Sequence, residues 1–118
     1  MKNENNPVGG LVISEEVIAK ISSTAALEIP GVAELKAKPA NVGEVIAQGG
    51  HKGIRVRTSD GVIRVDVYLT LKLGAKIREV SEGVQRSVKD NVQNMTGRVV
   101  DSVNVHIEDI DLSANTPE

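Results

Sequence analysis

The strict alternation of apolar and polar residues between positions 63 and 72 constrains the fold more than any other feature of the sequence. A period of two predicts a β-strand with one apolar and one polar face, and a shift of one residue would exchange the two faces. Residues 54–57 alternate in the same way, and the turn signal TSDG at 58–61 separates the two runs. We therefore predict a β-hairpin over residues 53–73. Its apolar face comprises Ile63, Val65, Val67, Leu69 and Leu71.

Two other segments carry apolar residues at intervals of three or four, which is typical of amphipathic helices. The first segment begins after Ser14, a favoured N-cap residue, and stops at Pro30-Gly31. The second spans residues 75–95 and is followed by Gly97, where a left-handed cap residue belongs. The predicted core positions are Val17, Ile18, Ile21, Ala25 and Ile29 in the first helix, and Ile77, Val80, Val84, Val88, Val92 and Met95 in the second.

Three shorter segments complete the predicted strands and loops. Residues 10–13 are expected to form an edge strand, residues 32–36 a second strand, and residues 103–107 a final strand with Val103 and Val105 in the core. Residues 37–53 contain Pro and Gly breakers and are expected to form a mobile loop. Because each helix has one apolar face, we predict an α+β, two-layer domain: one mixed or antiparallel sheet of about four to five strands with both helices on one face.

Length and composition narrow the class of protein. The 118 residues suit one domain, expected over residues 9–112 between a disordered tail at 1–8 and a flexible tail at 113–118. The core must be aliphatic because the chain has no Phe, no Trp and one Tyr. A net charge of -2 argues against a generic nucleic-acid or anionic-membrane binder. With no signal peptide and no apolar run of about 18 residues, we expect a cytoplasmic protein that reaches a membrane only through a partner.

Residues with catalytic or metal-binding chemistry are sparse. The absence of Cys excludes thiolate metal sites and cysteine nucleophiles, and no nucleophile elbow, Walker loop or dinucleotide fingerprint is present. His106 and Glu108, followed by Asp109 and Asp111, are of the types that hold a divalent cation, but the pattern also fits a solvated strand end. We predict no enzyme activity and no catalytic, cofactor or metal site.

A GxxG tetrapeptide, Gly50-His51-Lys52-Gly53, matches the loop by which KH domains clamp a nucleic-acid backbone. In a KH domain this loop joins two helices, whereas here Gly53 leads directly into a strand. The chain also lacks the aromatic residues on which bases stack. A KH-like nucleic-acid binder that uses Lys52, Arg55 and Arg57 is therefore kept as the alternative function.

Basic residues gather on the predicted outer face of the hairpin. Tyr and Arg are favoured at protein interfaces, so this face is the candidate partner-binding surface. The alternative is an ordinary solvated face, on which Asp66 relieves the positive charge. The candidate partner-binding residues are Arg55, Arg57, Arg64, Tyr68 and Lys72.

Three segments together resemble the alkaline shock protein family, the envelope-stress-response family of mainly Gram-positive bacteria. They are GLVISEEVIAKISSTAALEIPGVAEL at 10–35, GIRVRTSDGVIRVDVYLTLKLG at 53–74 and VQRSVKDNVQNMTGRVVDSVNVHIEDI at 84–110. Within them, Val84-Gln85, Met95-Thr96-Gly97 and Val103-Asn104-Val105 occupy family motif positions, whereas Leu73-Gly74 stands where relatives have an aromatic residue before glycine. The resemblance covers about residues 9–110.

The resemblance implies a non-enzymatic cytoplasmic module for protein interaction, involved in cell-envelope or membrane-lipid homeostasis. Its implied protein partners are a small membrane-anchoring protein or acetyl-CoA carboxylase subunits, the latter through control of fatty-acid synthesis. The resemblance also implies a homo-oligomer, and it transfers no catalytic residue to this chain.

Overall fold

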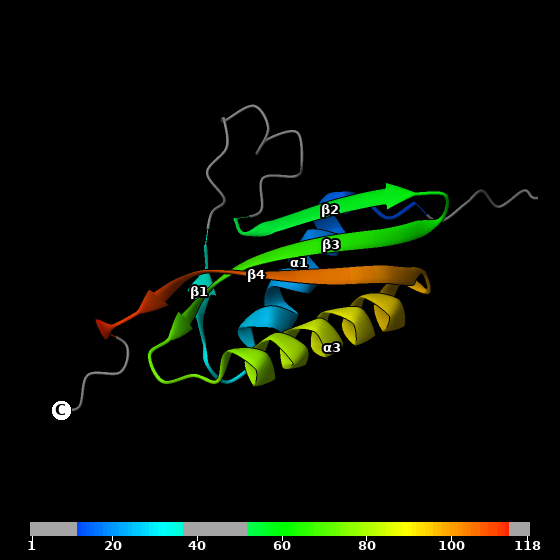
Figure 1. Cartoon of the computed structure of the whole chain (residues 1–118). Coiled ribbons are helices and arrows are strands. Elements are labelled where there is room, and N and C mark those ends of the chain that lie inside the picture. The colour runs from blue at the N-terminus through cyan, green and yellow to red at the C-terminus, as the bar shows by residue number, and fades with distance from the viewer. Residues whose placement is uncertain (1–11, 37–51, 114–118) are drawn as a thin grey trace, which may run out of the picture.

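The computed structural model describes residues 12–36 and 52–113. Its elements in chain order are α1 (Glu15–Leu27), β1 (Val32–Leu35), β2 (Ile54–Ser59), β3 (Val62–Lys72), α3 (Ile77–Thr96) and β4 (Val99–Asp111). The four strands form one sheet, and both helices pack on the same side of it (Figure 1). The predicted α+β, two-layer architecture is therefore confirmed.

The predicted hairpin is formed by β2 and β3, which pair antiparallel from Ile54 opposite Val67 to Ser59 opposite Val62. Asp60 and Gly61 connect them with positive φ values of 53° and 80°. Two positive φ angles in a two-residue loop define a type I′ turn, whose twist matches that of the flanking strands. The apolar side chains of β3 predicted to face the core are all fully buried.

The β3 strand lies at the centre of a mixed sheet. Along one edge, β2 pairs with its first half and β1 pairs antiparallel with its second half. Along the other edge, β4 runs parallel to β3, from Val62 opposite Val99 to Lys72 opposite Asp111. Parallel neighbours require a crossover connection, and α3 provides it. The sheet is therefore neither purely antiparallel nor formed from sequential hairpins.

The start of α1 corrects one predicted strand. Ser14 caps the helix by accepting a hydrogen bond from the Val17 N–H at 3.1 Å. Val12 and Ile13 do not lie in a strand, and the rest of the predicted 10–13 strand lies outside the described residues. Ile13 instead packs against the core cluster that contains Ile18, at the spacing of a hydrophobic staple. This contact fixes the direction from which the chain enters α1.

The buried side of α1 is also displaced from the predicted one. Ile18 and Ala25 are buried as expected, but Val17 is 47% exposed. Small side chains allow the helix to approach the sheet closely, which leaves the larger Val17 and half-buried Ile21 at its flank. The buried residues of α1 are Ile18, Ala19, Ser22, Ala25 and Ala26.

The second helix, α3, contributes four buried valines, Val80, Val84, Val88 and Val92. The predicted core positions at its two ends are wrong, because Ile77 is 52% exposed and Met95 is 68% exposed. Both residues lie in the terminal turns of α3. The apolar spacing of the helix therefore extends further than the sheet and α1 that could cover it. Gly97 ends the helix with φ 72°, as predicted, and Val103 of β4 enters the core.

Several predicted segments fall wholly or largely outside the described residues. They are the tail at 1–8, most of the loop at 37–53, and the tail at 113–118 apart from Ser113. The domain limits at 9 and 112 therefore stay predictions.

Candidate functional site

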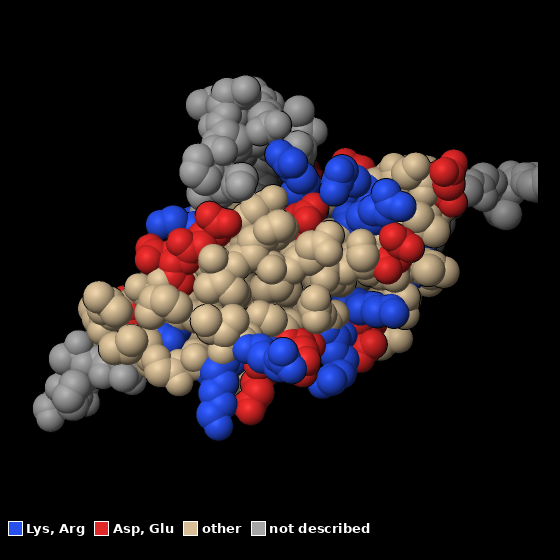
Figure 2. Space-filling model, in the orientation of Figure 1, with Lys and Arg blue, Asp and Glu red and all other residues tan. Residues whose placement is uncertain are grey.

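The candidate site is the outer face, which we define as the side chains of β2, β3 and β4 that point away from the helices. Figure 2 shows this side of the molecule, where an uncharged area separates a mainly acidic group of side chains from a mixed group that contains several basic ones. No helix among the described residues covers it (Figure 1). The alternation of the strands and their register assign to this face Arg55, Arg57, Arg64, Asp66, Tyr68, Thr70, Lys72, Ser102, Asn104 and His106.

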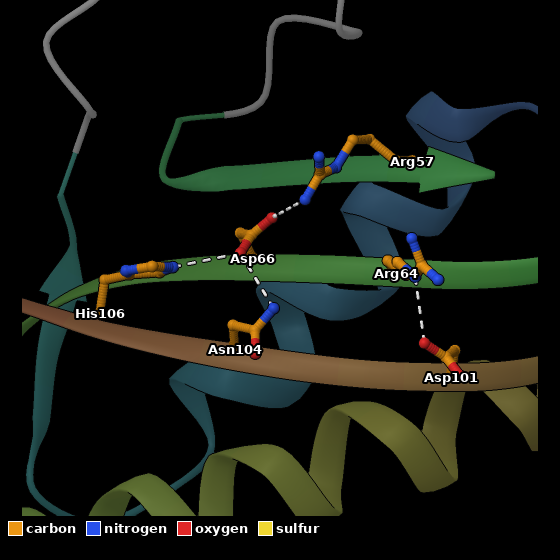
Figure 3. A network of polar contacts seen from close by, with 6 residues as sticks. All are labelled: Arg57, Arg64, Asp66, Asp101, Asn104 and His106. Carbon is orange, nitrogen blue, oxygen red and sulfur yellow. Dashed lines mark hydrogen bonds and ion pairs between the residues drawn. The ribbon is translucent and has the colours of Figure 1, made fainter. Parts of the chain in front are cut away.

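Asp66 is the centre of a polar network on the outer face (Figure 3). Arg57 donates from Nη2 to Oδ2 at 3.3 Å, and Asn104 donates from Nδ2 to Oδ1 at 3.3 Å. His106 Nε2 lies 3.1 Å from the same Oδ1. An ionised carboxylate only accepts hydrogen bonds, so this last contact requires the hydrogen on Nε2. The three partners come from two strands and allow Asp66 to be only 6% exposed on a face without a helical cover.

Tyr68 and His106 form the floor of the outer face beside this network. They stand opposite each other in the parallel β3–β4 pair, and their rings stack with centroids 4.4 Å apart and an interplanar angle of 13°. Tyr68 is only 6% exposed. Most of the Tyr68 side chain is therefore covered, and its role in partner binding stays a prediction.

Arg64 is held at the edge of the outer face by Asp101, with its Nε 3.0 Å from Asp101 Oδ2 (Figure 3). The β3–β4 register shifts between Ile63 and Arg64, so β4 has one extra residue there. That extra residue is Asp101, and the bulge brings its carboxylate beside the guanidinium. Both side chains are about half exposed, at 53% and 48%, so the pair orients charge more than it stabilises the fold.

The opposite end of the outer face is acidic. Glu34 of β1 stands opposite Thr70, which in turn stands opposite Asp109 of β4. Lys36 Nζ lies 3.3 Å from Asp109 Oδ2, and the Ile110 N–H donates to Oδ1 at 2.8 Å. The Ile110 hydrogen bond, together with Lys36, lowers the pKa of Asp109 below its ordinary value. Within the described part of the chain, the buried Thr70 Oγ1 has no hydrogen-bond partner.

The structure brings the five predicted partner-binding residues onto one face but gives them different roles. Arg57 and Arg64 are paired with carboxylates, Tyr68 is nearly buried, and Lys72 is exposed near the acidic end. Arg55 is half-buried beside Asp66 in the β2–β3 register. Sequence reasoning noted Asp66 only as a compensating charge and missed Asn104 and Asp101. No local signal marks those two residues, because their position depends on the register of a strand that is distant in sequence.

The alternative nucleic-acid surface is only partly described. Lys52 is exposed at the entrance to β2, whereas Gly50 and His51 of the GxxG loop lie outside the described residues. Gly53 leads directly into β2, so the helix that follows the loop in a KH domain is replaced by a strand. Arg57 is already paired with Asp66, which reduces the positive potential available to a phosphate.

The metal-binding hypothesis gains no geometric support. Across residues 12–36 and 52–113, no three His, Asp or Glu side chains gather in a way that would hold a metal ion. The β3–β4 register shifts again between Ile107 and Asp109, with Glu108 as the extra residue, and His106 is turned toward Asp66.

Within residues 12–36 and 52–113, neither helix is long and apolar enough to cross a membrane.

Comparison with known proteins identifies relatives over almost the whole length. A family model described as the alkaline shock protein 23 family, with cell envelope-related function, matches residues 3–112. The uncharacterized protein YqhY of Bacillus subtilis (strain 168) is 33% identical over 120 residues, covering 100% of this chain and 89% of YqhY. The uncharacterized protein Spy1614 of Streptococcus pyogenes serotype M6 is 36% identical over 110 residues, covering 90% of this chain and 91% of Spy1614.

The fold also resembles a solved structure of low sequence similarity. The copper form of MamM CTD aligns with a TM-score of 0.52 and 17% identity, covering 87% of this chain and 92% of that chain. At this identity the likeness concerns the fold alone. It supports the two-layer arrangement of the sheet and helices.

Proposed function

Because the chain belongs to the alkaline shock protein 23 family, whose function is related to the cell envelope, we propose that it is a non-enzymatic protein-interaction module for cell-envelope or membrane-lipid homeostasis. The sequence resemblance to alkaline shock proteins is confirmed by this membership. The observation that carries the proposal is the outer face, on which charged side chains are fixed in place around an uncharged centre.

Fixed side chains favour binding because ordering a long side chain at an interface costs free energy. The Arg57 and Arg64 guanidinium groups are already oriented by Asp66 and Asp101 in the free protein. The stacked Tyr68 and His106 rings add a rigid centre. Arg and Tyr are enriched where proteins meet, whereas a catalytic role would require a cleft with convergent reactive groups.

Charge would set the orientation of the partner. The three arginines lie toward one end of the outer face, and Glu34, Asp109 and Asp111 lie toward the other, where they outnumber Lys36 and Lys72. Such a surface favours a partner whose acidic groups meet the arginines and whose basic groups meet the carboxylates. The same partner bound in the opposite orientation would bring like charges together, which is unfavourable. We propose a protein partner, either a small membrane-anchoring protein or an acetyl-CoA carboxylase subunit, bound in the cytoplasm. Self-association into a homo-oligomer is part of the same proposal.

The test is an in-cell crosslinking pull-down of the tagged chain, read by mass spectrometry and by a nucleic-acid assay on the same eluate. The variant R57A/R64A removes two cations from the outer face. Its matched control, R78A/R86A, removes two exposed cations from α3 and changes the net charge equally. Circular dichroism checks that both variants are folded.

We expect the wild type and the control to enrich one envelope or lipid-synthesis protein, and the outer-face variant to lose it. Identical recovery from both variants would overturn the outer face as the contact surface. Recovery of RNA without a dominant protein partner would overturn the interaction-module function itself and favour the alternative that uses Lys52.

A further inference from the structure

A second surface lies on the helical side of the protein, where α1 and α3 border a groove of about 350 Å³. Val17, Ile21 and Ala25 of α1 line it together with Met95 of α3. Val17 is 47% exposed and Met95 is 68% exposed, although both are large apolar side chains. Leu27, three residues after the groove residue Thr24, is 49% exposed and lies on the flank of Thr24 away from the groove residues Ile21 and Ala25.

Exposed apolar side chains are ordinary when they are scattered, but here Val17, Ile21 and Leu27 all lie within about 60° of the exposed Thr24 on α1, and we call this face of the helix the stripe. Lys20 and Thr24 of α1 and its C-cap residue Glu28 complete the lining of the groove, at intervals of four residues. This spacing keeps them on one side of the helix. The stripe therefore combines apolar side chains with one base and one acid, a composition that suits packing against another amphipathic helix.

The order of residues in the stripe is symmetric about Thr24. Lys20 lies four residues before Thr24 and Glu28 four residues after it. Ile21 lies three residues before Thr24 and Leu27 three residues after it. Suppose that a second copy of the helix is packed antiparallel to the first, with the two Thr24 residues facing each other. Lys20 of one helix then lies opposite Glu28 of the other, and Ile21 lies opposite Leu27.

We propose that the occupant of this surface is a second copy of the chain, with the two α1 helices packed antiparallel about a two-fold axis at Thr24. Lys20 faces the partner's Glu28, and Ile21 packs against the partner's Leu27. The same contacts recur on the other side of the axis, as they must in an isologous dimer. The inference rests on the proposed interaction function and names one partner and its surface.

Charge complementarity favours a second copy over an unrelated helix. One rotation satisfies both Lys20 and Glu28 and gives two ion pairs from a single stripe, whereas an unrelated partner would need its own matching sequence of charges. Met95 flanks the Val17 end of the groove and extends the apolar contact onto α3. The outer face lies on the opposite side of the sheet, so a dimer of this kind leaves it free for the envelope partner.

The first test reverses the charges in the full-length chain. K20E and E28K each convert two attractions into two repulsions, and the double variant K20E/E28K restores both pairs in swapped order. By sedimentation velocity over a concentration series, we expect each single variant to weaken dimerisation about tenfold or more and the double variant to return near the wild type. A chain that stays monomeric at all concentrations, or a dimer that the single variants do not weaken, would overturn the interface.

The second test uses the absence of Cys from the sequence. In T24C the only thiol lies at the two-fold axis, so mild oxidation is expected to give a disulfide-linked dimer. The matched control is K89C, which places an exposed thiol on α3 away from the groove. Crosslinking of T24C no faster than of K89C would contradict the antiparallel pairing.

The outcomes separate this inference from the proposed function. Loss of the dimer in K20E with unchanged capture of an envelope protein would show two independent surfaces, as the inference expects. A monomeric wild type whose capture of another protein is abolished by K20E would show that the stripe binds that protein, and the inference would fail while the interaction function stands.

Discussion

The Tyr68 ring lies nearly parallel to the His106 imidazole, at 4.4 Å between centroids, while His106 Nε2 lies 3.1 Å from Asp66. One side chain of β4 thus contacts two residues of β3 that are two positions apart on the same face. The arrangement joins a parallel strand pair through side chains as well as through the backbone. It also gives the outer face a rigid centre.

Replacement of Asp66 by Ala is expected to destabilise the fold by about 1–3 kcal/mol, because Arg57, Asn104 and His106 lose their shared acceptor. Urea denaturation followed by circular dichroism measures this change. The matched control is D101A, which removes an exposed partner of Arg64 and should cost about 1 kcal/mol or less. Equal losses in the two variants would contradict the central role of Asp66.

Two glycines with positive φ should respond differently to Ala. Gly97 has φ 72° and no atom within 4 Å of an added Cβ, so G97A should cost about 1 kcal/mol from backbone strain alone. Gly31 has φ 100°, and its Cβ would lie 2.7 Å from Val80 Cγ2, so G31A should cost clearly more. Thermal or chemical unfolding compares the two variants. A larger loss in G97A would contradict the packing at Gly31.

Truncation of apolar residues of similar size should cost different amounts of stability in the core and at its margin. L69A deletes a fully buried side chain and is expected to cost about 2–5 kcal/mol. M95A truncates a side chain that is 68% exposed and should change stability by about 0.5 kcal/mol or less. Urea unfolding at low protein concentration makes the comparison in the monomer. A loss in M95A comparable to L69A would place Met95 in the core after all.

The pKa of Asp109 is lowered by the Ile110 N–H and by Lys36, so its ionised form stabilises the folded state. A carboxyl whose pKa is lower in the folded than in the unfolded state stabilises the fold at pH values above its unfolded pKa. This stabilisation is lost as the pH falls through its folded pKa. D109N should therefore be less stable than the wild type at neutral pH, with the difference shrinking below the ordinary value of 3.8. Unfolding free energies of both proteins measured across this range test the prediction. A difference that does not depend on pH would refute it.

Local patterns predicted most of the elements because their causes are local. The β2–β3 hairpin follows from alternation around the Asp60-Gly61 turn, and the ends of the helices follow from Ser14 and Gly97. The same reasoning failed at Val17 and Met95. Their spacing fits a buried face, but burial depends on how far the neighbouring layer extends, which periodicity does not encode.

Residue spacing along the chain was enough to predict the α+β class, the hairpin, the aliphatic core of β3 and the position of Arg55, Arg57 and Arg64 on one face. These properties depend on residue spacing, and spacing can be read along the chain. The parallel course of β4 beside β3 and the contacts of Asp66 with Arg57, Asn104 and His106 became visible only in the folded domain. The same holds for the bulge that pairs Asp101 with Arg64 and for the groove beside α1. Each of these contacts joins residues from different elements, and their register is set by packing of the whole domain rather than by any local preference.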